Sequence, residues 1–268
     1  MPITTRTIRN DRHNRKISSL WPYFAAFLLG MTLYSTAFAD PLPLFTARYT
    51  LSKAGIPLGE NIRTLTKTDD GGYLYQSVTH ATGLLAKFVK QEIVERSEWT
   101  YEGEGQNAQP RPLEYLSRRS GKSDKWIKQI FNWEKNTTTN ITSSKSWHTP
   151  LRPKIQDKLS YQLAIMNDLQ NGRKTLEYLI ADSDKVKNYR FVILGEEQVK
   201  TAMGTLRTLK IRRTGDSRNT TVWCAIDFHY LPVVLEQHDD EDGWLKMQIE
   251  SMQFENQKPE SKKQTPPA

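Results

Sequence analysis

The sequence predicts a mainly β fold, in which one large curved antiparallel sheet or half-open barrel carries a single amphipathic helix at about residues 157–170. Apolar and polar residues alternate along much of residues 40–255, which is the period of a strand with one buried and one solvated face. Turn-forming residues separate these runs, and tight turns join antiparallel neighbours. One segment shows a clear helical spacing instead.

Residues 1–39 have the pattern of an export signal. The segment begins with five cations: Arg6, Arg9, Arg12, Arg15 and Lys16. A charge-free apolar run from Leu20 to Phe38 follows, and the small residues Ala37 and Ala39 precede Asp40. Signal peptidase accepts small side chains at these two positions, so we expect cleavage between Ala39 and Asp40 and a periplasmic mature protein.

An uncleaved membrane anchor is the alternative to a cleaved signal. The 19 uncharged residues from Leu20 to Phe38 could just cross a hydrocarbon core of about 30 Å. Pro22 and Gly30 disfavour a long spanning helix, and the Ala-x-Ala ending favours removal. Since no later apolar run is long enough to span a bilayer, we expect no transmembrane segment after signal removal.

The charge of the chain does not indicate a nucleic-acid partner. The formal net charge of +8 falls to +4 without residues 1–39, because that segment holds five Lys/Arg and one Asp. A charge of +4 is ordinary for a domain of this length. Cys224 is the only cysteine, so the fold has no internal disulfide and must be stabilised by its core.

The predicted strands lie between turn signals along the whole domain. Alternation is clearest in four segments, at residues 45–52, 189–193, 222–226 and 245–249. Predicted turns lie at Asp69–Gly72, Glu102–Gly105, Ser120–Gly121, Gly215–Asp216 and Asp239–Gly243. The chain therefore has room for about a dozen short antiparallel strands.

The predicted helix has apolar residues three and four positions apart, at Leu159, Leu163, Met166 and Leu169. Asp157 can cap its first turn, and Asn171–Gly172 supplies a stop. We expect this helix to lie across one face of the sheet and to bury its apolar stripe there. A second, shorter helical turn is predicted at Gly83–Lys90.

Residues 40–255 are predicted to form a single β-rich domain, because no Pro/Gly/Ser-rich linker divides them. The tail at residues 256–268 has three prolines and no large apolar residue, so we expect it to be disordered.

No residue pattern indicates catalysis, a metal site or a cofactor. Cys224 is a candidate nucleophile, but it lies in an alternating run, where a cysteine behaves as a small buried hydrophobe. The four histidines of the predicted domain lack the spacing of metal ligands: His80, His148, His229 and His238. The acidic residues Asp239–Asp242 form too short a loop for an EF-hand and fit a solvated hairpin tip.

Two basic groups are the candidate binding residues, one around the predicted turn at Gly121 and one on a later strand. The first group comprises Arg111, Arg118, Arg119, Lys122, Lys125 and Lys128 and the nearby Trp126 and Trp133, and the second comprises Lys210, Arg212 and Arg213. The candidate binding residues among them are Arg118, Arg119, Lys125, Trp126, Lys210 and Arg212. Such groups could bind anionic lipid head groups or an acidic envelope glycan. The alternative is a solvated strand face that carries charged side chains and binds no ligand, because it would show the same pattern.

Several segments resemble one protein family. They are residues 45–49, Gly59–Glu60, residues 99–119, residues 161–164, Lys210–Ile211, and residues 223–233 with their Trp-x-x-x-Asp and Leu-Pro-Val motifs. Together they resemble exported proteins of Gram-negative bacteria known as domain-of-unknown-function family 3108. The resemblance implies a secreted, β-rich domain in the bacterial periplasm, and it carries over no catalytic residue.

The segment that carries the strongest part of this resemblance also has a structural interpretation. Trp223 and Tyr230 could flank a corner between two strands, while Asp227 and Pro232 favour a turn there. Proline also restricts the preceding Leu231 to extended geometry. A packing and turn role is favoured over a binding role.

Three classes of function are compatible with these features. The sequence favours a non-enzymatic periplasmic binding or carrier protein for an apolar or envelope-derived ligand, with an apolar groove covered by the helix. The first alternative is an assembly or structural factor that docks on an envelope protein. A hydrolase of envelope polymers is the third, and it would need convergent polar residues that the sequence does not reveal.

The export signal makes a prediction about the mature protein. Native mass spectrometry of protein isolated from the periplasm should give the mass of a chain that begins at Asp40, because Ala37 and Ala39 fit the peptidase. A mass that includes residues 1–39 would favour the uncleaved anchor.

Overall fold

The structure is a computed structural model, and it describes residues 42–83, 86, 91–103, 105, 108–121, 124–215, 219–239 and 243–255. The chain divides into Met1–Ala37 and Phe38–Ala268, and every described residue belongs to the second unit. Several predictions concern residues outside the described part. These residues are 1–40, most of Gly83–Lys90, the acidic residues 240–242 and residues 256–268. No described helix is long and apolar enough to cross a membrane.

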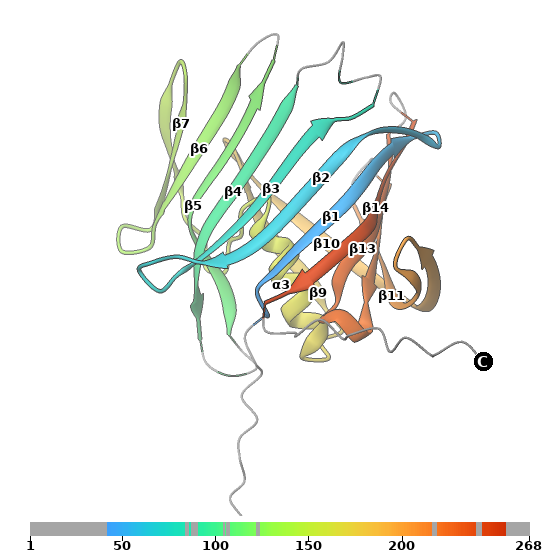
Figure 1. Cartoon of the computed structure of the whole chain (residues 1–268). Coiled ribbons are helices and arrows are strands. Elements are labelled where there is room, and N and C mark those ends of the chain that lie inside the picture. The colour runs from blue at the N-terminus through green and yellow to red at the C-terminus, as the bar shows by residue number, and fades with distance from the viewer. Residues whose placement is uncertain are drawn as a thin grey trace, which may run out of the picture. The chain divides into compact units, whose positions relative to one another are not determined.

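One antiparallel sheet contains the fourteen strands of the described residues (Figure 1). The strands are β1 (Phe45–Lys53), β2 (Ile56–Lys67), β3 (Tyr73–Ala81), β4 (Glu92–Glu102), β5 (Gln109–Ser120), β6 (Lys125–Asn132), β7 (Thr137–Thr142), β8 (Ser146–Pro150), β9 (Leu176–Asp182), β10 (Lys185–Thr201), β11 (Gly204–Thr214), β12 (Asn219–Ala225), β13 (Leu231–Asp239) and β14 (Gly243–Phe254). β1 lies inside the sheet, between β2 and β14. The chain runs outward from β1 to the edge strand β8, then returns from the other edge strand, β9, to β14. The predicted mainly β fold with one large antiparallel sheet is confirmed.

The alternation seen in the sequence places one face of each strand in the core. In β1, Phe45, Ala47 and Tyr49 are buried, and the residues between them are exposed. Phe45 lies opposite Leu65 of β2 and Phe254 of β14, which are buried as well. Burying a side chain of this size contributes about 1.5–3 kcal/mol, so such apolar rows hold neighbouring strands in register.

The helix α3 (Ser160–Gln170) connects the two edge strands and contacts β5 and β9 (Figure 1). Its side chains belong to two separate core clusters, since Leu163 and Met166 pack in one and Ile165 and Leu169 in the other. The prediction of one helix packed on the sheet is confirmed. The helix is buried on more than one side, because the sheet bends around it and both halves of the sheet cover it.

α3 begins three residues later than the predicted start, and its N-cap residue is Leu159, whose own side chain makes no capping bond; the carboxylate of Asp157, two residues earlier, caps the first turn instead. The Asp157 Oδ1 atom accepts hydrogen bonds from the backbone N–H groups of Leu159 and Ser160, both at 2.7 Å. Its Oδ2 atom accepts a 2.6 Å bond from the hydroxyl of Ser97 in β4. This predicted cap is confirmed, and it also fixes the start of the helix to the sheet.

The predicted stop at the end of α3 is confirmed too. Gly172 has a φ of +70°, a left-handed conformation that glycine adopts without strain. Its N–H donates to the carbonyl of Leu169, and the N–H of Arg173 donates to that of Asp168. Two carbonyls of the last helical turn, those of Asp168 and Leu169, are therefore satisfied.

The chain just before α3 covers the edge of β9. The N–H of Gln156 donates to the carbonyl of Leu179, and the N–H of Ala181 donates to the carbonyl of Gln156, both at 2.8 Å. The side-chain amide of Gln156 donates a 2.7 Å bond to the carbonyl of Pro110 in β5. Gln156 thus ties one half of the sheet to the other where the sheet is open.

The residues after β12 form the predicted corner. A 3-10 turn, η2 (Ile226–Phe228), is followed by His229 and Tyr230 with φ angles of 53° and 57°. Two successive residues in this region are strained, and the N–H of Tyr230 is held by a 2.9 Å bond to the carbonyl of Ala225. The carbonyl of Pro232 accepts a buried 2.9 Å bond from the hydroxyl of Tyr49. The predicted corner between the two strands is confirmed.

Asp157 should make the stability of the fold depend on pH. Burial raises the pKa of this carboxyl to about 6, against about 3.9 in an unfolded chain. The folded state thus favours the protonated carboxyl, which adds to the free energy of unfolding at low pH. This stabilisation is lost as the pH rises from about 4 to about 6. Urea unfolding of the wild type and of Asp157→Asn should show the wild type losing about 2 kcal/mol relative to the variant between pH 4.5 and pH 7.

Asp182 provides the matched control. Although burial acts in the opposite direction, the ammonium groups of Lys158 and Lys187 hold the pKa of Asp182 below its ordinary value. The contribution of Asp182 is therefore present throughout this pH range, and Asp182→Asn should show little change relative to the wild type. Equal pH slopes for the wild type and Asp157→Asn would contradict the prediction.

Candidate functional site

Cys224 is fully buried in β12 and has no described polar partner. Burial raises the pKa of its thiol to about 12, so a thiolate is not available near neutral pH. His229 lies within the corner after β12 and contacts the Gln170 side chain and the Phe254 ring. The structure therefore places no Cys-His pair at this position.

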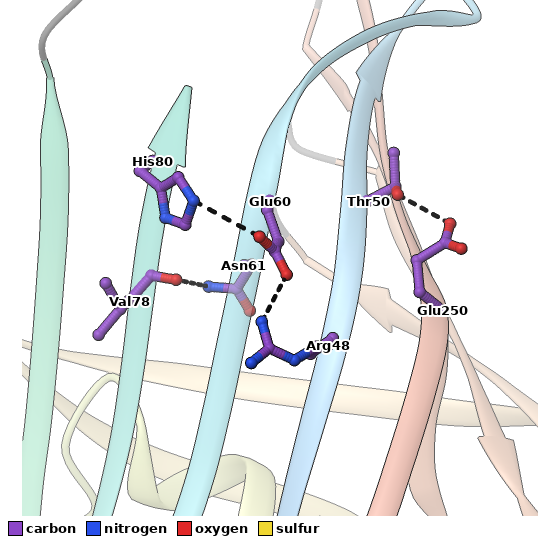
Figure 2. Close-up of polar contacts among 7 residues, drawn as sticks. All are labelled: Arg48, Thr50, Glu60, Asn61, Val78, His80 and Glu250. Carbon is purple, nitrogen blue, oxygen red and sulfur yellow. Dashed lines mark hydrogen bonds and ion pairs between the residues drawn. The ribbon is translucent and has the colours of Figure 1, made fainter. Parts of the chain in front are cut away.

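No three His, Cys, Asp or Glu side chains lie close enough to hold a metal ion within the part of the chain that the structure describes. The outer face of β1, β2 and β3 does carry a chain of polar contacts (Figure 2). Glu60 lies between Arg48, at 2.9 Å, and His80, at 3.5 Å. Side chains that are this exposed to solvent form weak ion pairs, which are typical of a solvated sheet face.

Lys210 of the second basic group contacts one residue of β10 and one of β12. Lys210 lies 3.0 Å from a carboxylate oxygen of Glu197 and 4.8 Å from the centre of the Trp223 ring. The Trp223 indole N–H donates to the same Glu197. Arg212 lies two residues along β11 and is exposed. Neither Lys210 nor Arg212 lines the groove described next.

Three residues of the first basic group come together at a groove of about 480 Å³. It is lined by Ser117, Arg119, Lys125, Trp126, Ile127, Thr142, Lys145, Trp147, Ser183 and Asp184. Arg118 is not among them, and it forms a 3.2 Å ion pair with Asp124 instead. The groove thus combines three cations, two tryptophans and one carboxylate.

Strand register explains how distant residues reach the groove. Ser117 of β5 lies opposite Ile127 of β6, which lies opposite Thr142 of β7, so the three side chains share one face. On β6 this face runs from the exposed Lys125 through Ile127 to the buried Gln129. One wall is therefore an extension of the inner face of the sheet.

The opposite wall comes from the other half of the sheet. Ser183 and Asp184 occupy the turn between β9 and β10, and both line the groove. The groove lies where strands β5 to β8 face this turn. It is therefore a consequence of a sheet whose two edges do not pair with each other.

Two groove residues, Trp147 and Lys145, are not among the predicted binding residues. Lys145 Nζ lies 4.7 Å from the centre of the Trp147 ring, a distance that permits a cation–π interaction. The indole N–H of Trp147 is shielded from solvent and has no hydrogen-bond partner among the described residues. An unpaired donor of this kind costs free energy unless a ligand or water satisfies it. The only available signal was the proximity of a lysine and a tryptophan in the sequence.

A family model described as "Protein of unknown function (DUF3108)" matches residues 45–250. The chain belongs to this family. The match runs from the first residue of β1 into β14, so it includes both walls of the groove and confirms the resemblance of the sequence segments. A search of curated proteins gives no match.

One solved structure is similar to this DUF3108 chain in fold. It is described as the crystal structure of a beta-barrel-like protein of domain of unknown function DUF1849 from Brucella abortus. The TM-score is 0.51 at 11% sequence identity, and the match covers 81% of this chain and all of the other. At this identity the similarity shows the fold alone.

Burial of Cys224 in the DUF3108 domain predicts an unreactive thiol. The folded protein should react with the disulfide reagent DTNB at least about a hundredfold more slowly than the protein in guanidinium, because both access and thiolate are missing. A Ser251→Cys variant, with its new thiol at an exposed site on β14, provides the reactive control. Comparable labelling rates for Cys224 and the added thiol would show that Cys224 is accessible.

Proposed function

We propose that this protein is a non-enzymatic binding protein of the bacterial envelope, and that its groove takes an anionic ligand with a saccharide part. The convergence of three cations and two tryptophans on one groove of about 480 Å³ carries the proposal. Pockets for small ligands typically measure about 300–1,000 Å³. The pattern of residues 1–39 supports the periplasm as the place where the ligand is met.

The chemistry of the lining selects the class of ligand. Arg119, Lys125 and Lys145 favour a carboxylate or phosphate, and only Asp184 opposes them. Trp147, which lies opposite Asn140 on the face that carries Thr142, offers a flat apolar surface together with an indole N–H donor. A sugar ring presents an apolar face together with hydroxyl acceptors, so an acidic sugar satisfies both kinds of group.

The interior offers less support for a buried acyl chain. The crevice between α3 and the strands β10 to β13 has a volume of only about 10 Å³. That is the size of one water-sized sphere. An apolar ligand there would have to displace α3, which packs in two core clusters. The groove therefore favours the polar, envelope-derived ligand over the apolar one.

An assembly factor is the second candidate, and the edge strand β8 is the observation that favours it. Among the described strands, β8 pairs with β7 alone, so one edge has free backbone groups that could take up a strand of a partner. The edge is short, and it ends at Pro150, which cannot donate a hydrogen bond. These features oppose strand addition, and the groove remains the better supported site.

Calorimetric titration with a soluble disaccharide–tetrapeptide muropeptide tests the binding proposal, since this probe joins sugar rings to carboxylates. Neutral chitobiose serves as the uncharged comparison. We expect binding of the muropeptide, and we expect Trp147→Ala and Lys125→Ala each to weaken it about tenfold, which corresponds to about 1.4 kcal/mol.

The matched controls are Trp244→Ala and Lys200→Ala, which remove an exposed tryptophan and an exposed lysine outside the groove. Both should bind as the wild type does. Equal loss in groove and control variants, or no binding of the muropeptide, would refute a saccharide site in the groove.

A further inference from the structure

A second hollow, which we call the apolar recess, lies beside the groove. It has a volume of about 160 Å³ and is formed by β1, β2, β3 and the start of β4. Its lining includes the aliphatic side chains of Leu51, Leu58, Ala81 and Ile93. Of the described residues that line it, none is Asp, Glu, Lys or Arg, so the recess differs in character from the cationic groove.

Strand register places the apolar recess on the inner face of the sheet. The hydroxyl of Thr79, which lines the recess, accepts a 2.8 Å hydrogen bond from the amide of Asn61. Asn61 is a buried residue of the inner face of β2. Thr79 of β3 lies directly opposite Ile93 of β4, and residues that are directly opposite share a face. The recess therefore opens on the same face as the groove.

Two small residues explain why the apolar recess is hollow. Gly59 lies between Leu51 and Ala81 in one row across β1, β2 and β3. A Cβ atom on residue 59 would lie 2.3 Å from the carbonyl oxygen of His80, so the close approach of β2 and β3 requires glycine here. Neither Gly59 nor Ala81 has a side chain that could fill the recess.

One cross-strand pair joins the apolar recess to the groove. Ile93 lines the recess and lies opposite Arg119 of β5, which lines the groove. Arg119 in turn lies opposite Lys125 of β6, another groove residue. The Cβ atoms of directly opposite residues are about 4.5–5.5 Å apart. The lining therefore changes from cationic to apolar within one strand spacing, and the two hollows adjoin.

We propose that the apolar recess binds a short apolar arm of the ligand whose acidic sugar lies in the groove. This inference rests on the proposed function of the groove, and it narrows the ligand to an amphiphilic acidic saccharide. Leu51 and Ile93 are only partly buried, and apolar surface that covers them contributes binding free energy. The recess has a third of the volume of the groove, about 160 Å³ against about 480 Å³, so it suits a short arm and not a long acyl chain.

Calorimetric titration with two glucuronides tests this inference. Hexyl β-D-glucuronide and methyl β-D-glucuronide share the acidic sugar and differ by five methylene groups. We expect the hexyl compound to bind at least about thirtyfold more tightly, or about 2 kcal/mol, which is about half of the gain that full burial of these groups would give. Hexyl β-D-glucoside has the same arm without the carboxylate, and it should bind at least about tenfold more weakly than hexyl glucuronide.

Two variants test the position of the arm. Ala81→Phe fills the apolar recess, and Ile93→Ser removes an aliphatic part of its lining. Each should reduce the advantage of the hexyl over the methyl glucuronide to about threefold or less and leave the affinity for the methyl compound unchanged. Ile130→Ser is the matched control, because Ile130 is an exposed isoleucine of β6 that lines neither hollow. It should keep the full advantage.

Photolabelling of the wild-type protein does not depend on how the variants fold. A hexyl glucuronide with a diazirine at the end of its arm should label peptides that contain Ala81 or Ile93. An excess of unlabelled hexyl glucuronide should prevent this labelling. Labels confined to other peptides, or a full hexyl advantage in both recess variants, would place the arm elsewhere and overturn the inference.

The titrations separate this inference from the proposed function. Equal affinities for the two glucuronides would overturn the apolar arm and leave the groove as a saccharide site. Equal affinities for hexyl glucoside and hexyl glucuronide would show an apolar site independent of the groove cations, and would overturn it too. If neither glucuronide binds, the inference is refuted, and the muropeptide titration alone decides whether the groove binds a saccharide.

Discussion

Burial of α3 inside the bend of the sheet is the constraint on which the rest of the structure depends. A helix covered on more than one side must have its polar groups satisfied by the strands around it. Asn167 donates a 2.6 Å bond to the carbonyl of Ala108, before β5, while Asp168 accepts bonds from Gln109 at 2.5 Å and from Tyr178 of β9 at 2.8 Å. The helix therefore holds together two parts of the sheet that do not pair with each other, and it fixes how far apart they lie.

This constraint also explains where the open part of the molecule lies. β1 joins both halves of the sheet, whose edge strands are β8 and β9, and α3 contacts β5 in one half and β9 in the other. Gln156 bridges the two halves at one place, because it bonds to Leu179 and Ala181 of β9 on one side and to Pro110 of β5 on the other. Away from this bridge the halves are separate, and the groove occupies that space between β5 to β8 and the turn after β9. The groove is thus a product of the open sheet.

The sequence predicts local structure better than pairing. Alternation identified β1 and β14, but it could not show that Phe45 pairs with Phe254, because a period of two reports burial and carries no information on the partner strand. The helix was predicted from its apolar spacing, but the burial of Asn167 and Asp168 could not be, since most of the groups that satisfy them are distant in sequence. Within the groove, Arg119 and Lys125 were found because a short turn joins their strands. Trp147 and Asp184 reach it only through the tertiary fold.

The inner face of the sheet gives the strongest argument about the kind of ligand. Arg63, Ser77, Glu95 and Ser117 lie opposite one another on the successive strands β2 to β5, and Ser117 already lines the groove. Neighbouring strands are about 4.8 Å apart, so this polar row extends about 15 Å from the buried cation to the groove. A carrier for acyl chains needs a continuous apolar lining, because each desolvated polar group beside the chain would lose its hydrogen bonds. A sheet that keeps a polar row along its covered face is instead suited to a polar, negatively charged molecule at its opening.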